Sequence, residues 1–217
     1  MANQWLQGQG LEVGALHNPL MVPPTAHVAY VDRMDVASLR QHYPELATVA
    51  LVPVDVVDNG ETLETFAADS QDFLIGNHFL EHCQDPIGTL KNWLRVLKPG
   101  GVIYMAVPNK HQSFDRNRSE TSWDHLVQDH QDSGKGSRAD HYFEWVTLVD
   151  PQPVAHQAAA QQHLMAQDYS IHFHVWTPHS LEVFLSRCIT ELHLPYEICA
   201  FEKNGSEIIA ILRKRVP

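Results

Sequence analysis

Short apolar runs recur along the first half of the chain, and most are continuous rather than alternating with polar residues. Continuous runs of this length indicate strands that are buried on both faces of a parallel sheet. We therefore expect five such strands, joined by right-handed crossovers. The runs occupy residues 11–13, 27–31, 50–54, 73–75 and 102–107.

Segments of helical character lie between these runs, and the clearest covers residues 85–98. Asp85 can cap this helix, and Pro86 suits its first position. Apolar residues follow at positions 87, 90, 93, 94 and 97, which places them on one stripe of the helix surface. Shorter helices are expected over 36–42 and 178–188. Strands that alternate with helices in this way predict an α/β fold.

The C-terminal part of the chain has a different pattern. Two strand-like runs, 196–201 and 207–212, flank the dipeptide Asn204-Gly205. An Asn-Gly pair between two such runs is a strong signal for a hairpin, because both residues tolerate a positive φ. An antiparallel pair is therefore expected to close an otherwise parallel sheet.

Residues 109–175 interrupt the alternation of strands and helices. The segment is polar, carries eight of the 15 histidines, and has helical stretches near 123–130, 142–148 and 154–165. A segment of about 65 residues with few large apolar side chains buries too little surface to fold alone. We therefore expect a single domain over 1–217, with 109–175 as an insertion or lid within it.

Composition narrows the range of partners. Of 217 residues, 44% are hydrophobic and 19% charged, and the formal net charge is −11. The acidic balance argues against nucleic acid as a partner, because phosphate binding needs a basic surface. No apolar run reaches the 18 residues of a membrane span, and the N-terminus does not resemble a secretory signal. Three cysteines far apart in the sequence are typical of a reduced, cytoplasmic protein.

Three residues at the ends of predicted strands could form a ligand site. Gly14 follows the first strand, Asp32 ends the second, and Asp55 ends the third. Glycine lets a ligand approach the backbone closely, and an acidic side chain at the second strand end can bind both hydroxyls of a ribose. These strand ends meet at the carboxyl edge of the sheet, where open α/β sheets bind ligands.

A second motif identifies the family that this chain resembles. Leu80-Glu81-His82 follows the fourth strand, Asp85-Pro86 opens the next helix, and Arg95-Val-Leu-Lys-Pro-Gly-Gly101 leads into the fifth strand. In this order and spacing the residues resemble class I S-adenosylmethionine-dependent methyltransferases, specifically the ubiquinone-biosynthesis-like group. The resemblance covers residues 8–108, and the C-terminal hairpin fits the last strands of that family. It does not cover the insertion.

The resemblance implies a fold, a cofactor and a set of binding residues. The fold would be a Rossmann-like seven-stranded sheet in the order 3-2-1-4-5-7-6 with strand 7 antiparallel, and the reaction would be methyl transfer from S-adenosylmethionine. Asp32 matches the residue that binds the ribose, and Asp55 matches the one that binds the adenine amino group. The cofactor-binding residues implied in this way are Glu12, Gly14, Ala15, Asp32, Asp55, Asn77 and His78.

Two departures from the family pattern leave alternatives open. Leu16 and Asn18 stand where further glycines are expected, so the loop must turn differently. A catalytically inactive binding module of the same fold is therefore the main alternative to an enzyme. The N-terminal helix of the family is nearly absent, so a second copy of the chain in a homodimer could cover the cofactor. The acceptor could be a small molecule, a lipid-linked precursor or a sugar.

The histidines supply the candidate bases. His172 and His174 would share one face of a strand, so the pair could bind a metal or place one imidazole over the acceptor. His111 follows the fifth strand, and we expect His111 and His174 to be the catalytic candidates, with His78 behind them. His78, Glu81 and His82 also fit a zinc-hydrolase pattern, but that chemistry requires both histidines on one helical face. Because His78 falls at a strand end, we expect no metal there.

Overall fold

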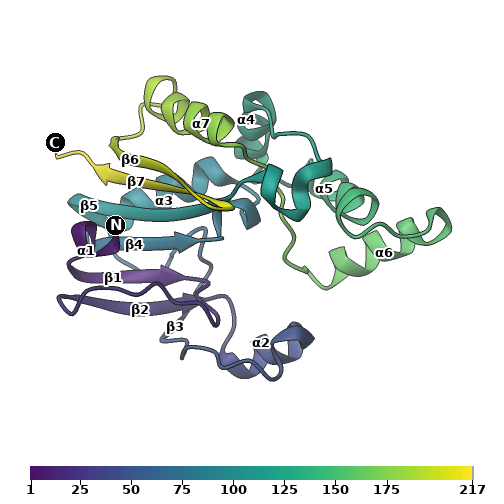
Figure 1. Ribbon diagram of the computed structural model, residues 1–217, viewed down its shortest axis with the longest axis horizontal. Coiled ribbons are helices and arrows are strands. Elements are labelled where there is room, and N and C mark those ends of the chain that lie inside the picture. The colour runs from purple at the N-terminus through teal and green to yellow at the C-terminus, as the bar shows by residue number, and fades with distance from the viewer. Residues whose placement is uncertain (217) are drawn as a thin grey trace.

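The computed structural model describes residues 1–216, and its seven strands form one mixed sheet (Figure 1). The strands are β1 (Gly8–Val13), β2 (Ala26–Asp32), β3 (Val56–Val57), β4 (Gln71–Asn77), β5 (Leu97–Pro108), β6 (Tyr196–Asn204) and β7 (Glu207–Lys214). Their order is β3-β2-β1-β4-β5-β7-β6, and β7 is antiparallel to both of its neighbours. The predicted sheet order and the antiparallel hairpin are confirmed.

Helices lie on both sides of this sheet and beyond its carboxyl edge. They are α1 (Ala2–Trp5), α2 (Val36–His42), α3 (Pro86–Val96), α4 (Trp123–Asp132), α5 (Arg138–Glu144), α6 (Val154–Ala166) and α7 (Pro178–Thr190). Short 3₁₀ turns occupy Pro44–Leu46, Leu80–His82, Lys110–Gln112 and Phe114–Asn117, and a π-helical turn occupies Trp145–Val149. α5 and α6 project away from the sheet in Figure 1.

The two faces of the sheet are covered unequally. On one face, side chains of α3 and α7 form a large core with the strands, in which Trp93 and Leu185 are fully buried. On the other face, a smaller core forms against Leu6 and the partly buried side chains of α1. The N-terminal helix has only four residues, as the sequence indicated. The second face is therefore closed largely by α1 and by the loop after β1.

The start of α3 forms as predicted, but its end differs. Asp85 Oδ1 accepts a hydrogen bond from Gly88 N at 2.8 Å, and Pro86 is the first helical residue. The helix ends at Val96 rather than at residue 98, because Leu97 already pairs with Gln71 as the first residue of β5. Arg95 fixes this end of the helix by donating to the carbonyls of Leu63 and Phe66, each at 2.8 Å.

The third strand is not where its apolar run predicts it. Residues 51–54 have no strand structure, and β3 consists of Val56 and Val57 only, at the edge of the sheet. Pro53 has no N–H to donate to a neighbouring strand, which explains why the apolar run does not pair. Asp55 therefore precedes the strand, and the residues that follow β3 are Asp58 and Asn59.

Residues 109–175 form α4, α5, α6 and their connecting turns beside the carboxyl edge of the sheet. A buried ion pair joins its parts, since Arg118 contacts Asp115 at 2.9 Å and Glu144 at 2.7 Å. Arg118 also donates to the carbonyls of His172 and Phe173. Within residues 1–216, no helix has the length and apolarity required to cross a membrane.

Candidate active site

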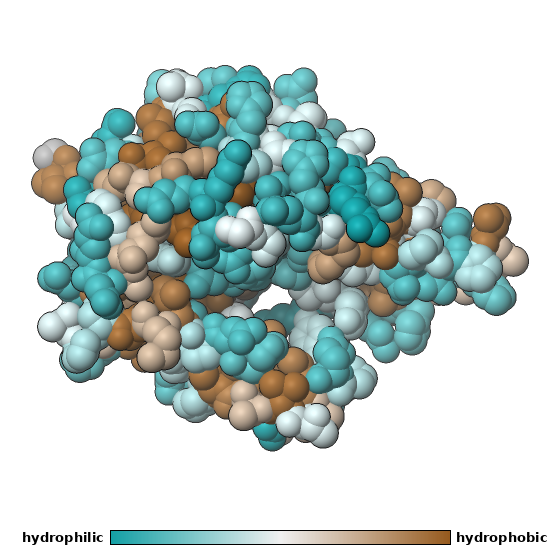
Figure 2. Space-filling view, viewed as in Figure 1, coloured by the Kyte–Doolittle hydropathy of each residue, from teal (hydrophilic) through white to brown (hydrophobic). Residues whose placement is uncertain are grey.

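A cavity of about 400 Å³ lies at the carboxyl ends of β1, β2 and β4. The surface is hollowed in this region, between the strand ends, α2 and the chain that leads from α6 to α7 (Figure 2). The volume falls in the range of small-molecule sites. Its wall on the sheet side comes from strand ends and the residues after β3: Val13, Gly14, Asp32, Asn59, Gly60, Glu61, His78 and Phe79.

The turn after β1 brings backbone into the cavity. Gly14 has φ +67, and a Cβ at this position would lie 3.3 Å from the ring of Phe79. Leu16, which replaces an expected glycine, also has a positive φ of +49 and lines the cavity. Its carbonyl accepts a hydrogen bond from Val52 N at 2.8 Å, which holds this unusual conformation. The loop therefore makes a left-handed turn without glycine at Leu16.

Asp32 ends β2 and points its carboxyl group to the cavity wall. Oδ1 accepts a hydrogen bond from Arg33 N at 2.7 Å. Burial raises the pKa of Asp32 above its ordinary value, against hydrogen bonds that lower it. The neighbouring Arg33 donates to Asp168 Oδ2 and to the hydroxyl of Tyr43. Arg33 thus joins the edge of the sheet to the insertion across the cavity, a role that the sequence did not reveal.

Asp55 does not reach the cavity. Its side chain is exposed, and Oδ2 accepts a hydrogen bond from Tyr30 N at 2.8 Å. The structure contradicts its predicted place at the end of the third strand, because β3 begins only after it. Asn59 and Glu61 line the cavity at the position expected for Asp55. The sequence signal for Asn59 and Glu61 was their place among the polar residues that directly follow the apolar pair Val56–Val57.

The end of β4 carries a cationic histidine. His78 has φ +51, and its Nε2 lies 2.9 Å from Glu207 Oε1 while Nδ1 lies 3.6 Å from Glu81 Oε1. The nearby Glu81 carboxylate raises the pKa of His78 to about 9, assisted by Glu207 and opposed by burial. His78 is therefore protonated at neutral pH and is not available there as a base. The neighbouring Asn77 does not line the cavity.

His82 lines the cavity in the opposite charge state. Burial lowers its pKa to about 4, so the ring is neutral at pH 7. Nδ1 lies 2.9 Å from the carbonyl oxygen of Ile171. Because a carbonyl only accepts, Nδ1 carries the proton and Nε2 is left as the acceptor. The sequence placed His82 in a recognised motif without giving it this role.

Four other predicted residues lie outside the cavity wall. Glu12 is buried, and its Oε1 accepts a hydrogen bond from Leu20 N at 2.9 Å, while burial raises its pKa to about 7. Ala15 faces a smaller hollow beside Leu51 and Val52. His111 is exposed. His174 is fully buried among other histidines, and burial lowers its pKa to about 3.

The zinc-hydrolase pattern is not assembled as that chemistry requires. His78 precedes the 3₁₀ turn Leu80–His82, so His78 and His82 do not share a helical face. His78 contacts Glu207 instead. The reason is the left-handed backbone at His78, which ends the strand without starting a helix.

The far wall of the cavity comes from α2, the turn after it, and the insertion. Aromatic side chains dominate this wall and face the strand ends: Tyr43, Tyr142, Tyr169 and Phe173. Acidic side chains outnumber basic ones around the cavity as a whole. They are Asp32, Glu45, Glu61 and Asp168 against Arg33 and His78.

Comparison with known families identifies the family of the chain that carries this site. Residues 8–187 match the family described as methyltransferase domain. The chain belongs to this methyltransferase family. It is an S-adenosylmethionine-dependent methyltransferase, and the predicted class I family is confirmed. The finer assignment to the ubiquinone-biosynthesis-like group stays a prediction. Among proteins with curated descriptions, none matches this methyltransferase.

Solved structures share the fold of the methyltransferase at low sequence identity. A SAM-dependent methyltransferase from Aquifex aeolicus is 13% identical, with 98% of this chain and 84% of that chain covered and a TM-score of 0.50. One from Methanosarcina mazei is 17% identical, with 97% and 94% covered and a TM-score of 0.50. One from Thermotoga maritima is 13% identical, with 96% and 83% covered and a TM-score of 0.51.

The cavity fits the cofactor of the methyltransferase. Gly14 leaves room above the strand end, and Asp32 offers a half-buried carboxyl group at the end of the neighbouring strand. The acidic excess around the cavity suits the positive charge of a sulfonium.

Proposed function

We propose that this methyltransferase binds S-adenosylmethionine at the strand ends of the cavity and methylates a small neutral or cationic molecule held against the insertion. The observation that carries the proposal is the cavity itself, which has Gly14 and Asp32 on one wall and aromatic residues of the insertion on the other. Bound here, the cofactor supplies an activated methyl group, and the chain supplies alignment and exclusion of water.

Three parts of the chain would hold the cofactor. The backbone at Gly14 would contact its methionine part, and the Asp32 carboxyl group would accept hydrogen bonds from the ribose hydroxyls. Asn59 and Glu61 replace Asp55 as the polar groups for the adenine, because they line the cavity and Asp55 does not. Glu12 would not contact the cofactor; it holds the loop after β1 by accepting a hydrogen bond from Leu20 N.

The acceptor side favours an uncharged or cationic molecule with an apolar part. Tyr43, Tyr169 and Phe173 offer aromatic surface, and Glu45 adds a negative charge, whereas Asp168 is already paired with Arg33 and Arg138. A phosphate or carboxylate would meet unfavourable charge at this wall, which also supports the prediction that nucleic acid is not the substrate. A homodimer that covers the cofactor stays a prediction.

His82 would receive the hydrogen bond from the acceptor. Its Nδ1 is engaged by Ile171, and its neutral ring leaves Nε2 able to accept from an N–H or O–H group. Such a contact orients the lone pair of the acceptor atom toward the methyl group, which is the alignment the reaction requires. His111 and His174, predicted as catalytic from the sequence, lie outside the cavity wall and are not assigned this role.

The test is transfer of labelled methyl from S-adenosylmethionine to a panel of small amines and phenols, each paired with a phosphorylated or carboxylated analogue. We expect transfer to the neutral or cationic member of each pair. Transfer only to the anionic members, or to nucleic acid alone, would refute the proposed acceptor class.

The role of His82 is tested with His82→Asn, whose amide can still donate to Ile171 but lacks a nitrogen at the Nε2 position. We expect kcat to fall by about 10-fold or more, the effect of one lost hydrogen bond, with cofactor affinity unchanged. His111→Asn is the comparison, since that side chain is exposed. A loss of kcat in His111→Asn but not in His82→Asn would return the role to His111.

A further inference from the structure

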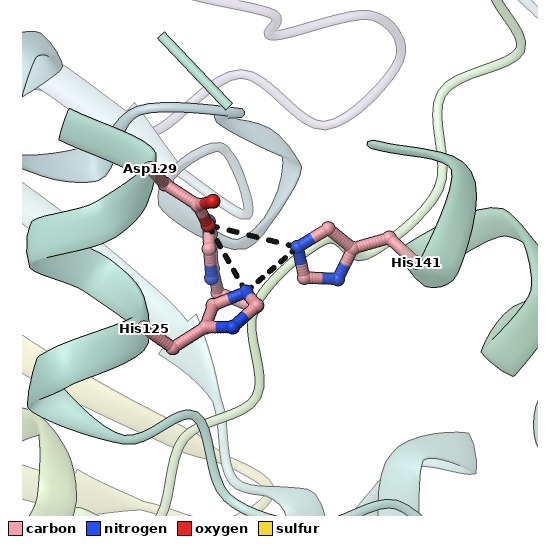
Figure 3. A group of neighbouring side chains, drawn as sticks. His125, Asp129 and His141 are labelled. Atoms are coloured by element: carbon pink, nitrogen blue, oxygen red, sulfur yellow. Dashed lines mark hydrogen bonds and ion pairs between the residues drawn. The ribbon is translucent and has the colours of Figure 1, made fainter. Parts of the chain in front are cut away.

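A cluster of three histidines and one aspartate lies outside the cavity, in the insertion (Figure 3). His125 and Asp129 are one helical turn apart on α4, and His141 lies on α5. His174 comes from the chain just before α7. Each residue offers one ligand atom, and these four atoms all lie within 4.8 Å of one another.

Four of the six distances between ligand atoms in the cluster are close to those of a tetrahedral coordination shell. Four atoms at about 2.0–2.1 Å from a tetrahedral ion lie about 3.3 Å from one another. Here Nε2 of His125 lies 3.0 Å from Nε2 of His141 and 3.1 Å from Asp129 Oδ2. Asp129 Oδ2 lies 3.6 Å from Nε2 of both His141 and His174.

The cluster is buried, and its polar atoms are incompletely satisfied by the protein. The side chains of Asp129 and His174 are 0% exposed. Within residues 1–216, Asp129 Oδ2 and His174 Nε2 have no hydrogen-bond partner. Leaving buried polar groups without partners costs free energy, so such groups call for an explanation. A bound cation would satisfy both atoms at once.

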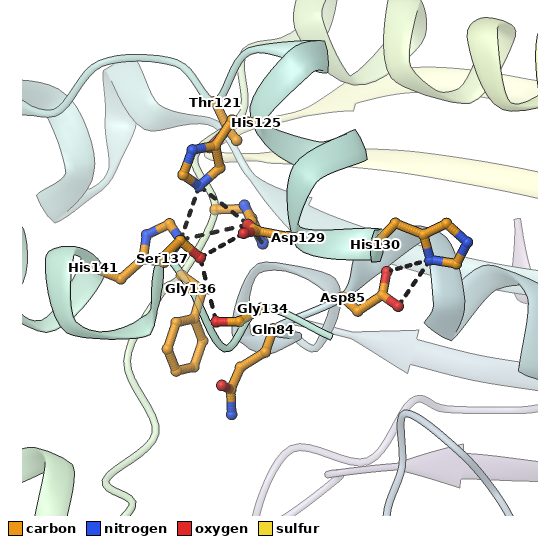
Figure 4. Close-up of polar contacts among 12 residues, drawn as sticks. Gln84, Asp85, Thr121, His125, Asp129, His130, Gly134, Gly136, Ser137 and His141 are labelled. Carbon is orange, nitrogen blue, oxygen red and sulfur yellow. Dashed lines mark hydrogen bonds and ion pairs between the residues drawn. The ribbon is translucent and has the colours of Figure 1, made fainter. Parts of the chain in front are cut away.

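A second set of contacts orients the aspartate. Ser137 Oγ donates a hydrogen bond to Asp129 Oδ1, which turns Oδ2 toward the imidazoles (Figure 4). Ser137 Oγ also lies 3.3 Å from the carbonyl oxygen of Gly134, which ties this hydroxyl group to the loop between α4 and α5. Hydrogen bonds of this kind, which fix the orientation of a ligand, are typical of metal sites.

We propose that His125, Asp129, His141 and His174 bind one divalent transition-metal ion, with Zn²⁺ as the ion that their geometry favours. Three imidazole nitrogens and one carboxylate oxygen suit Zn²⁺ better than Mg²⁺ or Ca²⁺, which prefer oxygen ligands. Four protein ligands leave no open position, so the site is structural rather than catalytic. The sequence alone did not identify this set of ligands, because the four residues are spread over 50 positions of a segment with no recognised motif.

The proposed ion would hold the wall of the active-site cavity. Tyr142 follows one ligand in the sequence and Phe173 precedes another, and both line the cavity. The rings of Tyr142 and Phe173 also contact each other, with centroids 5.7 Å apart. By joining α4, α5 and the chain before α7, the ion would fix these two side chains relative to each other.

A second group, Glu81, His82 and His172, is a weaker candidate. It has three members, and His172 Nδ1 is already paired with Asp115 Oδ2 at 2.7 Å. It serves as the competing location in the test below.

The experiment measures Zn²⁺ bound by the full chain after chelator treatment and titration against a competing chelator. The variants are Asp129→Asn and His125→Gln for the proposed site and His172→Gln for the competing group. His130→Gln is the matched control, because His130 lies on the same helix but contacts Asp85 Oδ2 at 2.9 Å instead of the cluster (Figure 4). Substitution with Co²⁺ adds a readout on the unmodified chain, since a tetrahedral site gives intense ligand-field absorption.

We expect one equivalent of Zn²⁺ in the unmodified chain and in His130→Gln, a higher Tm with zinc, and affinity reduced by more than about 10-fold in Asp129→Asn and His125→Gln. Absence of tight binding by the unmodified chain would overturn the proposal, as would loss of binding in His172→Gln alone. If either ligand variant fails to fold, Co²⁺ spectra of the unmodified chain decide, and an octahedral spectrum would refute the site.

Discussion

Asp32 at the end of β2 and His78 after β4, on either side of β1, show how single residues give the cavity its charge. Asp32 is an acid half-buried at the wall, and His78 is a cation held by Glu81 and Glu207. Asp32 is the last residue of β2, and His78 is the first residue after β4. At both positions the backbone leaves the sheet, and both side chains line the cavity. The charge of each follows from its immediate neighbours rather than from its residue type.

Asp32→Ala is expected to weaken S-adenosylmethionine binding by about 1–3 kcal/mol, because a charge-assisted hydrogen bond to the ribose is lost. Titration calorimetry measures the change. Asp55→Ala is the matched control and should leave affinity unchanged, since Asp55 is exposed and faces Tyr30 N. A loss confined to Asp55→Ala would show that the cofactor lies elsewhere.

His78 should titrate with a pKa of about 9 in NMR spectra of the folded chain. Its pKa is raised on folding, so its contribution to stability is complete below about 6.5, the ordinary value, and is lost as pH rises through 9. The His78→Gln variant should therefore lack this part of the decline in the free energy of unfolding. A shift of this size corresponds to about 3 kcal/mol, and because 48% of the side chain is exposed, screening by solvent makes the expected contribution smaller than that. Identical pH profiles of the two proteins would contradict the assignment.

Helices and strands were predicted correctly where they are long or carry a clear local sequence signal. The Asp85-Pro86 start of α3 and the hairpin between β6 and β7 depend on residues close in sequence, and both were predicted. β3 was misplaced because it has only two residues and lies at the edge of the sheet, where burial imposes little pattern. The loop between α4 and α5 packs against Gln84, a contact between positions about 50 residues apart that no local signal in the sequence indicates.

This loop gives a prediction at the same scale. Gly134 has φ +70, and a Cβ there would lie 2.6 Å from the carbonyl oxygen of Gln84, whereas Gly205 has φ +60 with nothing within 4 Å. We expect Gly205→Ala to cost about 1–2 kcal/mol from backbone conformation alone. Gly134→Ala should cost more, because backbone must also move. Urea unfolding compares the two variants, and equal losses would mean that the contact with Gln84 is not formed.

Across the whole molecule, the insertion and the sheet meet around one cavity. Arg33, next to the proposed ribose-binding residue, reaches Asp168 at 2.9 Å on the far wall. The pair is partly exposed, so it contributes little to global stability while still restraining the insertion.

Arg33→Gln should therefore increase amide hydrogen exchange in residues 168–173 while changing the free energy of unfolding by less than about 1 kcal/mol. Arg187→Gln is the control, because it removes another exposed arginine–carboxylate pair, with Glu191, away from the cavity. Unchanged exchange in Arg33→Gln would show that the insertion is held by other contacts.

The sequence by itself determined the class of the protein. Continuous apolar runs and the Asp85-Pro86 helix start predicted an α/β sheet, and the run from Arg95 to Gly101 carried the family resemblance that implied the sheet order and the cofactor. These features depend on residues close in sequence, so they can be read without a structure. Among the site residues, Gly14, Asp32 and His78 were placed at strand ends and do line the cavity.

Only the tertiary structure decided what the histidines do. His82 lies in the cavity, whereas His174 is buried and packs against His125 and His141. His125 lies on α4, His141 on α5 and His174 in the chain before α7, so residues up to 49 positions apart in the sequence meet in this cluster. Charge state, burial and ligand geometry arise from such long-range contacts, and no periodic pattern in a single segment records them.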